Sequence, residues 1–139
     1  MAKWFFVALL ALHAHFAASY VVPLDAASQR EFGGLLRWAW PWSDGDGGPL
    51  GHVTVAAGFP VAGLFLAATA ATLFVLAALA VAGFWVPAGW WRLLAGAGAA
   101  LSLVLMGLFP GPTKLLPMAL DLVVLWAVVT NWPAILAVE

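Results

Sequence analysis

Three ionisable side chains lie inside long apolar stretches of this sequence, namely His13, His15 and Asp121. Ionisable groups are costly within a membrane, so those found there usually pair with one another or serve a function. At a helical rise of about 1.5 Å per residue, Asp121 lies roughly 10 Å from the end of its stretch near Lys114. His15 and His13 lie about 10 and 13 Å from the end of theirs near Val22. The shared depth predicts that Asp121 pairs with His13 or His15.

The two histidines are not equivalent candidates. Successive helical residues turn by about 100°, so His13 and His15 point about 200° apart. One of them should face the other helices, and the second should face a neighbouring helix, a partner subunit or the membrane interface. Two roles stay open for the pair: a polar clamp that fixes helix register, or ligand and proton handling. Hydrogen bonds between membrane helices average about 0.6 kcal/mol, which is sufficient for a clamp.

Several other chemistries lack support in the sequence. The chain has no cysteine, which excludes disulfides, thiolate metal sites and cysteine nucleophiles. The remaining histidine, His52, lies at the surface end of the second apolar stretch, which disfavours bis-histidine haem within one chain. Ser19 and Ser102 have no evident neighbouring base. The sequence predicts no catalytic residue and no metal site, while a quinone, or a haem or pigment held by one histidine, stays open.

The composition indicates a membrane protein. Of the 139 residues, 65% are hydrophobic and only 8% are charged, whereas about a quarter of the residues in a soluble domain are charged. The formal net charge is −1, and the chain has no basic tract, so a nucleic-acid partner is not expected. Membrane lipid should therefore surround most of the polypeptide.

Four apolar stretches are long enough to cross a bilayer, which takes roughly 20 residues. Prolines lie near their ends, where a missing N–H group costs little. The stretches cover residues 4–22, 60–84, 90–109 and 113–132. They predict an all-α membrane protein: one domain, 1–139, that forms an antiparallel bundle of four transmembrane helices. The first stretch also resembles a secretory signal, with "AAS" before Tyr20, but its histidines interrupt the apolar core and favour a retained helix.

The aromatic residues support four crossings, because Trp and Tyr gather at membrane interfaces. Four crossings separate the interfacial aromatics into two groups: Trp4, Trp85, Trp90, Trp91 and Trp132 on one side, and Tyr20, Trp38, Trp40 and Trp42 on the other. We expect both termini, with Lys3 and Arg92, in the cytoplasm of a bacterial inner membrane, because the long loop on the other side carries Asp25, Glu31, Asp44 and Asp46. The positive-inside rule opposes this orientation slightly, because Arg30, Arg37 and Lys114 are then outside.

The segment 23–59 is the only sizeable polar part of the chain. Its "DAASQREFGGLLRWAW" portion predicts a short amphipathic helix, which Ser28 and Glu31 would begin as a capping box. Such a helix should lie flat at the membrane interface, either as a lid over the outer mouth of the bundle or as an anchored connector. The residues expected to form an outer pocket or lid are Tyr20, Arg30, Arg37, Trp38, Trp40, Trp42 and Lys114.

Small residues also recur at helical spacing. Gly96 and Ala100 form one small-xxx-small pair, and Ala67 and Ala71 form another. Such pairs let membrane helices approach closely. The sequence thus predicts tight helix contacts at these positions, within the bundle or between subunits.

The chain resembles small four-helix bacterial membrane proteins of the DoxX-like kind. Leu12-His13, the Trp90-Trp91 pair, and Lys114 shortly before Asp121 also resemble a related uncharacterised group. The similarity is better in the first apolar stretch than in the three later ones, and the long Trp-rich loop departs from it. It implies a four-helix membrane fold in a group that includes subunits linked to quinone-dependent oxidation. No catalytic residue is carried over.

These features favour an accessory or stabilising membrane subunit over an enzyme. It would belong to a larger membrane assembly, such as an electron-transfer complex, or to a homo-oligomer. Its expected partners are lipid and other membrane-embedded chains. The first alternative is a redox membrane protein that binds a quinone, porphyrin or lipid. The second is a small proton-coupled transporter that acts as a dimer, with Asp121 as the proton-carrying carboxylate.

Overall fold

In the computed structural model, residues 1–21, 41–42 and 59–133 are described. All regular structure in these ranges is helical, as the sequence predicts. The long helices are α1 (Ala2–Ala18), α5 (Phe59–Ala82), α6 (Trp91–Leu108) and α7 (Leu115–Thr130). Two 3₁₀ turns, η1 (Ala88–Trp90) and η2 (Pro112–Lys114), precede α6 and α7. The predicted amphipathic helix, with Arg30, Arg37, Trp38 and Trp40, lies outside the described residues.

Three segments are long and apolar enough to cross a membrane: Val61–Ala82, Ala88–Leu108 and Pro112–Thr130. This finding supports an integral membrane protein. The α1 helix is shorter than the predicted 4–22, because it ends at Ala18 and residues 19–21 form a turn. Its 17 residues span roughly 25 Å, against about 30 Å of hydrocarbon in a typical bilayer.

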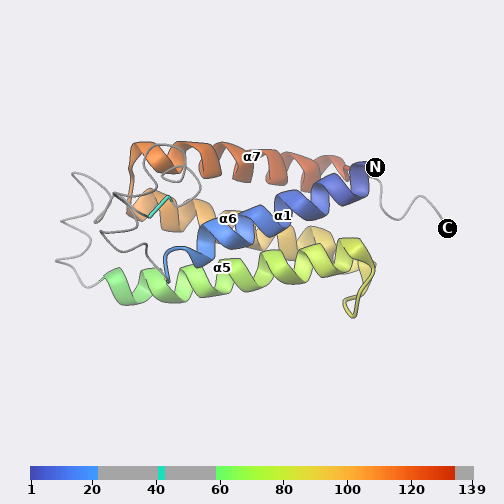
Figure 1. Cartoon of the computed structure of the whole chain (residues 1–139), viewed down its shortest axis with the longest axis horizontal. Helices are drawn as coiled ribbons and strands as arrows, with labels where there is room; N and C mark the ends of the chain where they lie inside the picture. The colour runs from blue at the N-terminus through green and yellow to red at the C-terminus, as the bar shows by residue number, and fades with distance from the viewer. Residues whose placement is uncertain (22–40, 43–58, 134–139) are drawn as a thin grey trace, which may run out of the picture.

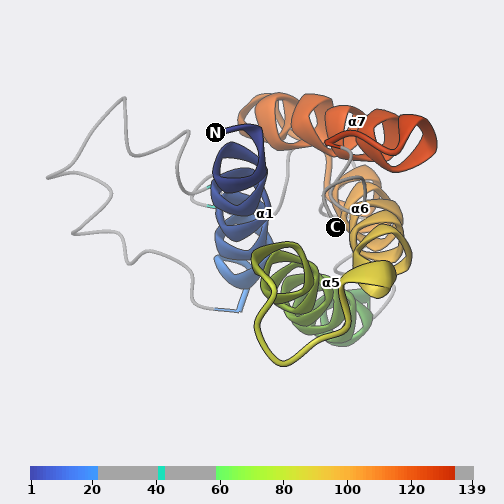
Figure 2. The same cartoon turned by 90° about the vertical axis from the view of Figure 1, so that its right-hand side faces the viewer.

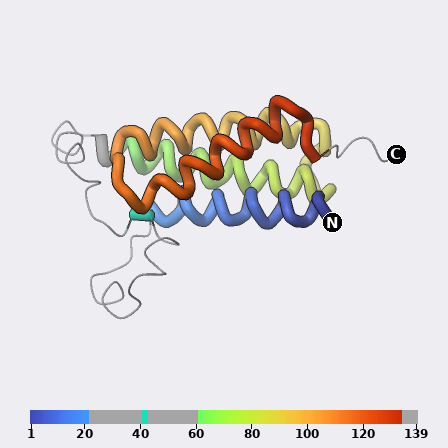
Figure 3. The backbone as a smooth tube through the Cα atoms, turned by 90° about the horizontal axis from the view of Figure 1, so that it is seen from above, coloured from blue at the N-terminus to red at the C-terminus, as the bar shows by residue number. Residues whose placement is uncertain are grey.

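The four helices lie lengthwise beside one another (Figure 1). Viewed end-on, α1, α5, α6 and α7 follow each other around a common centre (Figure 2). One end of the molecule, the terminal end, holds the N-terminus, the α5–α6 connection and the last residues of α7 (Figure 3). The opposite end, the loop end, holds the last residues of α1, the α6–α7 connection and Pro41–Trp42.

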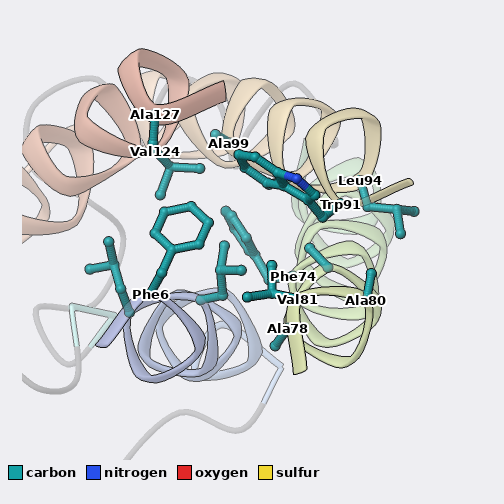
Figure 4. Packing of buried hydrophobic residues seen from close by; sticks show 14 of the residues in the cluster. Phe6, Phe74, Ala78, Ala80, Val81, Trp91, Leu94, Ala99, Val124 and Ala127 are labelled. Carbon is teal, nitrogen blue, oxygen red and sulfur yellow. The ribbon is translucent and has the colours of Figure 1, made fainter. Parts of the chain in front are cut away.

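The main core takes large side chains from all four helices (Figure 4). Phe6 of α1 contacts Trp91 of α6 edge to face, with ring centroids 5.4 Å apart, and Phe74 of α5 and Val124 of α7 lie in the same core. The sequence places Trp91 among the interfacial aromatics, but its side chain is fully buried. Position near a helix end therefore does not by itself place an indole at the interface.

A second cluster lies at the loop end. It contains Phe16, Trp42, Ala67, Leu105, Met106 and Phe109. Trp42, also predicted at the interface, is buried here. This loop-end cluster packs residues of α1, α5 and α6 around the indole of Trp42.

Glycines on α6 allow its neighbours to approach closely. A Cβ atom at Gly96 would lie 3.5 Å from Val128 of α7, so this member of the predicted Gly96–Ala100 pair faces another helix. The tighter contact is at Gly98, where a Cβ would lie 3.2 Å from the ring of Phe74. That spacing leaves little room for any side chain at position 98.

Candidate functional site

A polar cluster lies between three helices. It consists of His13 on α1, Ser102 on α6 and Asp121 on α7, whose exposed fractions are 1%, 2% and 0%. Polar groups buried in this way need hydrogen-bond partners within the protein. Ser102 and Asp121 are hydrogen-bonded to each other, and His13 lies within ion-pair distance of Asp121.

Asp121 is the centre of this polar cluster. The Ser102 hydroxyl donates a hydrogen bond of 2.6 Å to Oδ2 of Asp121. The Nε2 atom of His13 lies 3.5 Å from Oδ1 of the same carboxyl group. The first distance is that of a short charge-assisted bond, and the second is within ion-pair range but longer than a typical hydrogen bond. One carboxyl group thus links α7 to both α6 and α1.

The orientation of His13 is set by its own helix. Its Nδ1 atom lies 2.9 Å from the carbonyl oxygen of Leu9. A carbonyl oxygen can only accept, so Nδ1 carries the hydrogen, and Nε2 of the neutral ring is then an acceptor. The ring also lies 5.1 Å from that of Phe74 and 6.1 Å from that of Phe16. Backbone and aromatic contacts together direct Nε2 toward Asp121.

The structure brings Asp121 together with His13, one of the two histidines considered from the sequence. His15 is half-buried, and its ring lies beside Phe16, 6.1 Å away. This arrangement follows from the opposite directions of the two imidazoles on one helix. The pair thereby connects α1 to α7.

Sequence reasoning missed the role of Ser102, for which it found no neighbouring base. The structure places the Asp121 carboxyl group against this hydroxyl. A usable signal was present: seven residues separate Ser102 from Phe109, so at about 1.5 Å per residue its depth is roughly 10 Å. That depth equals the one estimated for Asp121. Depth matching applied to hydroxyl groups as well as ionisable ones would have found the contact.

A second polar arrangement anchors Trp42 at the loop end. Its indole N–H donates to the carbonyl oxygen of Phe16, at 3.0 Å. The Nζ atom of Lys114 lies 4.9 Å from the centroid of the Trp42 ring, in a cation–π contact. Thr113 donates to the carbonyl oxygen of Pro41 at 2.9 Å. These contacts connect residues 41–42 to the end of α1 and to η2.

Three of the seven predicted pocket residues gather at this end: Tyr20, Trp42 and Lys114. Tyr20 lies edge-on to Trp42, with centroids 4.7 Å apart. Its hydroxyl lies against α5 at Gly63, where a Cβ atom would overlap it. Lys114 is fully buried although it carries an ammonium group. The three form a packed aromatic and cationic contact, and the other four predicted residues lie outside the described ranges.

Metal binding finds no support in the part of the chain that the structure describes. No three His, Cys, Asp or Glu side chains gather there in a way that could hold a metal ion. The His13–Asp121 pair supplies two ligands at most. Its contacts fit hydrogen bonding and proton sharing between helices.

No family model, no curated protein and no solved structure matches this chain. The resemblance to DoxX-like proteins therefore stays a prediction from a few sequence positions.

Proposed function

We propose that the chain is a multi-pass integral membrane protein whose helices α1, α5, α6 and α7 form an antiparallel transmembrane bundle. The three long apolar segments support this proposal. Helix α1 lies beside α5 (Figure 2) and contributes Phe6 and Leu10 to the buried core. With the turn that follows it, α1 offers 20 residues, 2–21, for the crossing.

For the orientation, we propose that the terminal end faces the cytoplasm of a bacterial cell. Lys3 and Arg92 both belong to this end of the molecule. The acidic residues Asp25, Glu31, Asp44 and Asp46 of the loop 23–59 support this orientation, whereas Arg30, Arg37 and Lys114 oppose it slightly by the positive-inside rule. Arg92 also donates to the carbonyl oxygen of Val128 at 2.9 Å, which satisfies a backbone group near the end of α7.

As to function, we propose an accessory or stabilising subunit of a larger membrane assembly, or of a homo-oligomer. The observation that carries this proposal is the contrast between the interior of the bundle and its outer surface. The buried polar side chains at mid-bundle contact one another, whereas large apolar side chains cover the outward faces. Examples with more than half of their surface exposed are Val61, Phe65, Leu93, Leu122, Trp126 and Val129.

In this proposal the polar cluster is an internal register lock. Asp121 contacts Ser102 on one side and His13 on the other, so α7 meets both neighbours at one fixed depth. Sliding α6 by one turn would leave Oδ2 of Asp121 without its hydrogen-bond donor, and sliding α1 by one turn would break the ion-pair contact with His13. A fixed register also fixes the positions of the outward side chains relative to one another, which gives a partner chain a constant surface to bind.

Association can be tested in native membranes. The tagged chain is extracted in mild detergent, and its complexes are weighed by native mass spectrometry. We expect the chain to form complexes of fixed stoichiometry, with other chains or with further copies of itself. Trp126→Ala on α7 or Phe65→Ala on α5 should reduce the amount of these complexes. Gly89→Ala is the control, because a Cβ there meets nothing within 4 Å. A single chain surrounded by detergent and lipid alone would contradict the proposal.

A further inference from the structure

Two buried atoms at the centre of the polar cluster face each other without any other partner. They are Nε2 of His13 and Oδ1 of Asp121, 3.5 Å apart, and in the part of the chain that the structure describes neither has a hydrogen-bond partner. The remaining polar atoms of both side chains are engaged: Nδ1 of His13 with the Leu9 carbonyl, and Oδ2 of Asp121 with Ser102. The only position left for a shared hydrogen lies between Nε2 and Oδ1.

Counting protons identifies the stable form of the pair. With no proton between them, a lone pair on Nε2 faces a carboxylate, and the site carries a net charge of −1 among apolar side chains. With two protons, the net charge is +1 and both groups are donors. With one proton the pair is neutral overall, either as imidazole with carboxylic acid or as imidazolium with carboxylate. An apolar interior disfavours the two charged forms.

We propose that His13 and Asp121 form a binding site for a single exchangeable proton, held between Nε2 and Oδ1. Ser102 is a positioning residue, because its hydrogen bond to Oδ2 turns Oδ1 toward α1. Transfer of the proton between the two atoms changes neither the proton count nor the net charge. This inference goes beyond the role as a subunit and does not depend on it.

The groups that face the pair come from every helix of the bundle. The ring of Phe74 on α5 and that of Phe16 on α1 cover His13, and the Ser102 hydroxyl on α6 contacts Asp121. Lys114 precedes Asp121 by seven residues, or about 10 Å along the helix, and its ammonium group lies over Trp42. His13 and Asp121 are therefore the titratable groups in direct contact at this site.

The test uses the full chain in lipid vesicles, labelled with ¹⁵N at histidine, and follows the imidazole nitrogens by NMR over pH. His13→Gln assigns the signals. We expect Nδ1 of His13 to keep its hydrogen while Nε2 of His13 changes its protonation in one step. In Asp121→Asn the midpoint of this step should move to lower pH, to a proton concentration at least about tenfold higher, because the paired negative charge is lost.

Ser102→Ala gives a second arm if Asp121→Asn does not fold. Loss of a hydrogen bond to the carboxylate makes the carboxylate a stronger proton acceptor. The midpoint of the step should therefore move to higher pH, to a proton concentration roughly tenfold lower. Ser102→Thr should restore the original midpoint, and His15→Gln should leave it unchanged. The proposal is overturned if Nε2 of His13 shows no step, or if its step is the same in wild type, Asp121→Asn and Ser102→Ala.

Discussion

Asp121 connects three helices through its two carboxyl oxygens. Ser102 contacts one oxygen and His13 faces the other, and all three side chains are shielded from solvent. Depth along the apolar stretches is enough to predict the contact between helices α1 and α7. Which of the two histidines faces Asp121 depends on the rotation of α1 about its own axis. An almost uniformly apolar sequence gives too little pattern to predict that rotation.

Removing the Ser102 hydroxyl should destabilise the protein. Ser102→Ala leaves one carboxyl oxygen of Asp121 without its donor, and we expect a loss of about 0.6–1.7 kcal/mol in the free energy of unfolding. Unfolding in mixed micelles at increasing SDS fraction measures this change. Ser19→Ala is the matched control. The buried Ser19 hydroxyl donates a hydrogen bond of 2.7 Å to the carbonyl oxygen of Phe16, which belongs to the same helix, so this bond does not connect two helices. Equal losses in both variants would contradict the inter-helix role.

The two histidines should respond differently to substitution. His13→Leu leaves Oδ1 of Asp121 facing an apolar group, and we expect a loss of about 1–3 kcal/mol in unfolding free energy. His15→Leu changes a half-buried ring and should cost less. The same micelle assay compares them, and a larger loss for His15→Leu would show that the polar cluster is not the stabilising contact.

At the scale of the helices, close packing between α5 and α6 depends on Gly98. A side chain there would meet the ring of Phe74, which lies 3.2 Å from the position of a Cβ. Gly98→Leu should therefore destabilise the protein by about 1–3 kcal/mol through overpacking. Gly107→Leu lies on the same helix with nothing within 4 Å of its Cβ and serves as the control. Similar unfolding curves for the two variants would contradict this packing.

Trp42 should stabilise the last turn of α1. Trp42→Ala removes the hydrogen bond to the Phe16 carbonyl and the ring beside Tyr20, so we expect faster amide hydrogen exchange over residues 16–20. Trp85→Ala is the control, because that side chain is 96% exposed. Unchanged exchange rates in Trp42→Ala would show that α1 is held without this anchor.

The presence of the helices could be predicted from the sequence. The residues at which they end and the faces that they turn toward the core were harder to predict. The first stretch continues to Val22 in hydropathy, but α1 ends at Ala18, where Ser19 bonds back to the carbonyl oxygen of Phe16. Trp90 and Trp91 look alike in the sequence, yet one is exposed and the other is fully buried. Local hydrogen bonds and helix rotation decide these outcomes, and apolar periodicity is too weak here to reveal them.

At the scale of the whole molecule, composition alone predicts the membrane. A chain with 8% charged residues cannot cover itself with a hydrated surface, and three of its segments are long enough to cross a bilayer. The partner is harder to predict, because lipid chains and partner helices favour the same apolar side chains.

The most direct test of the account is whether α1 crosses the membrane together with the three longer helices. The chain has no cysteine, so single cysteines at Ala2, Gly89 and Leu115 can be labelled with an impermeant maleimide in oriented vesicles. We predict that Ala2→Cys and Gly89→Cys react from one side and that Leu115→Cys reacts from the other. Reaction of Ala2→Cys and Gly89→Cys from opposite sides would contradict the account.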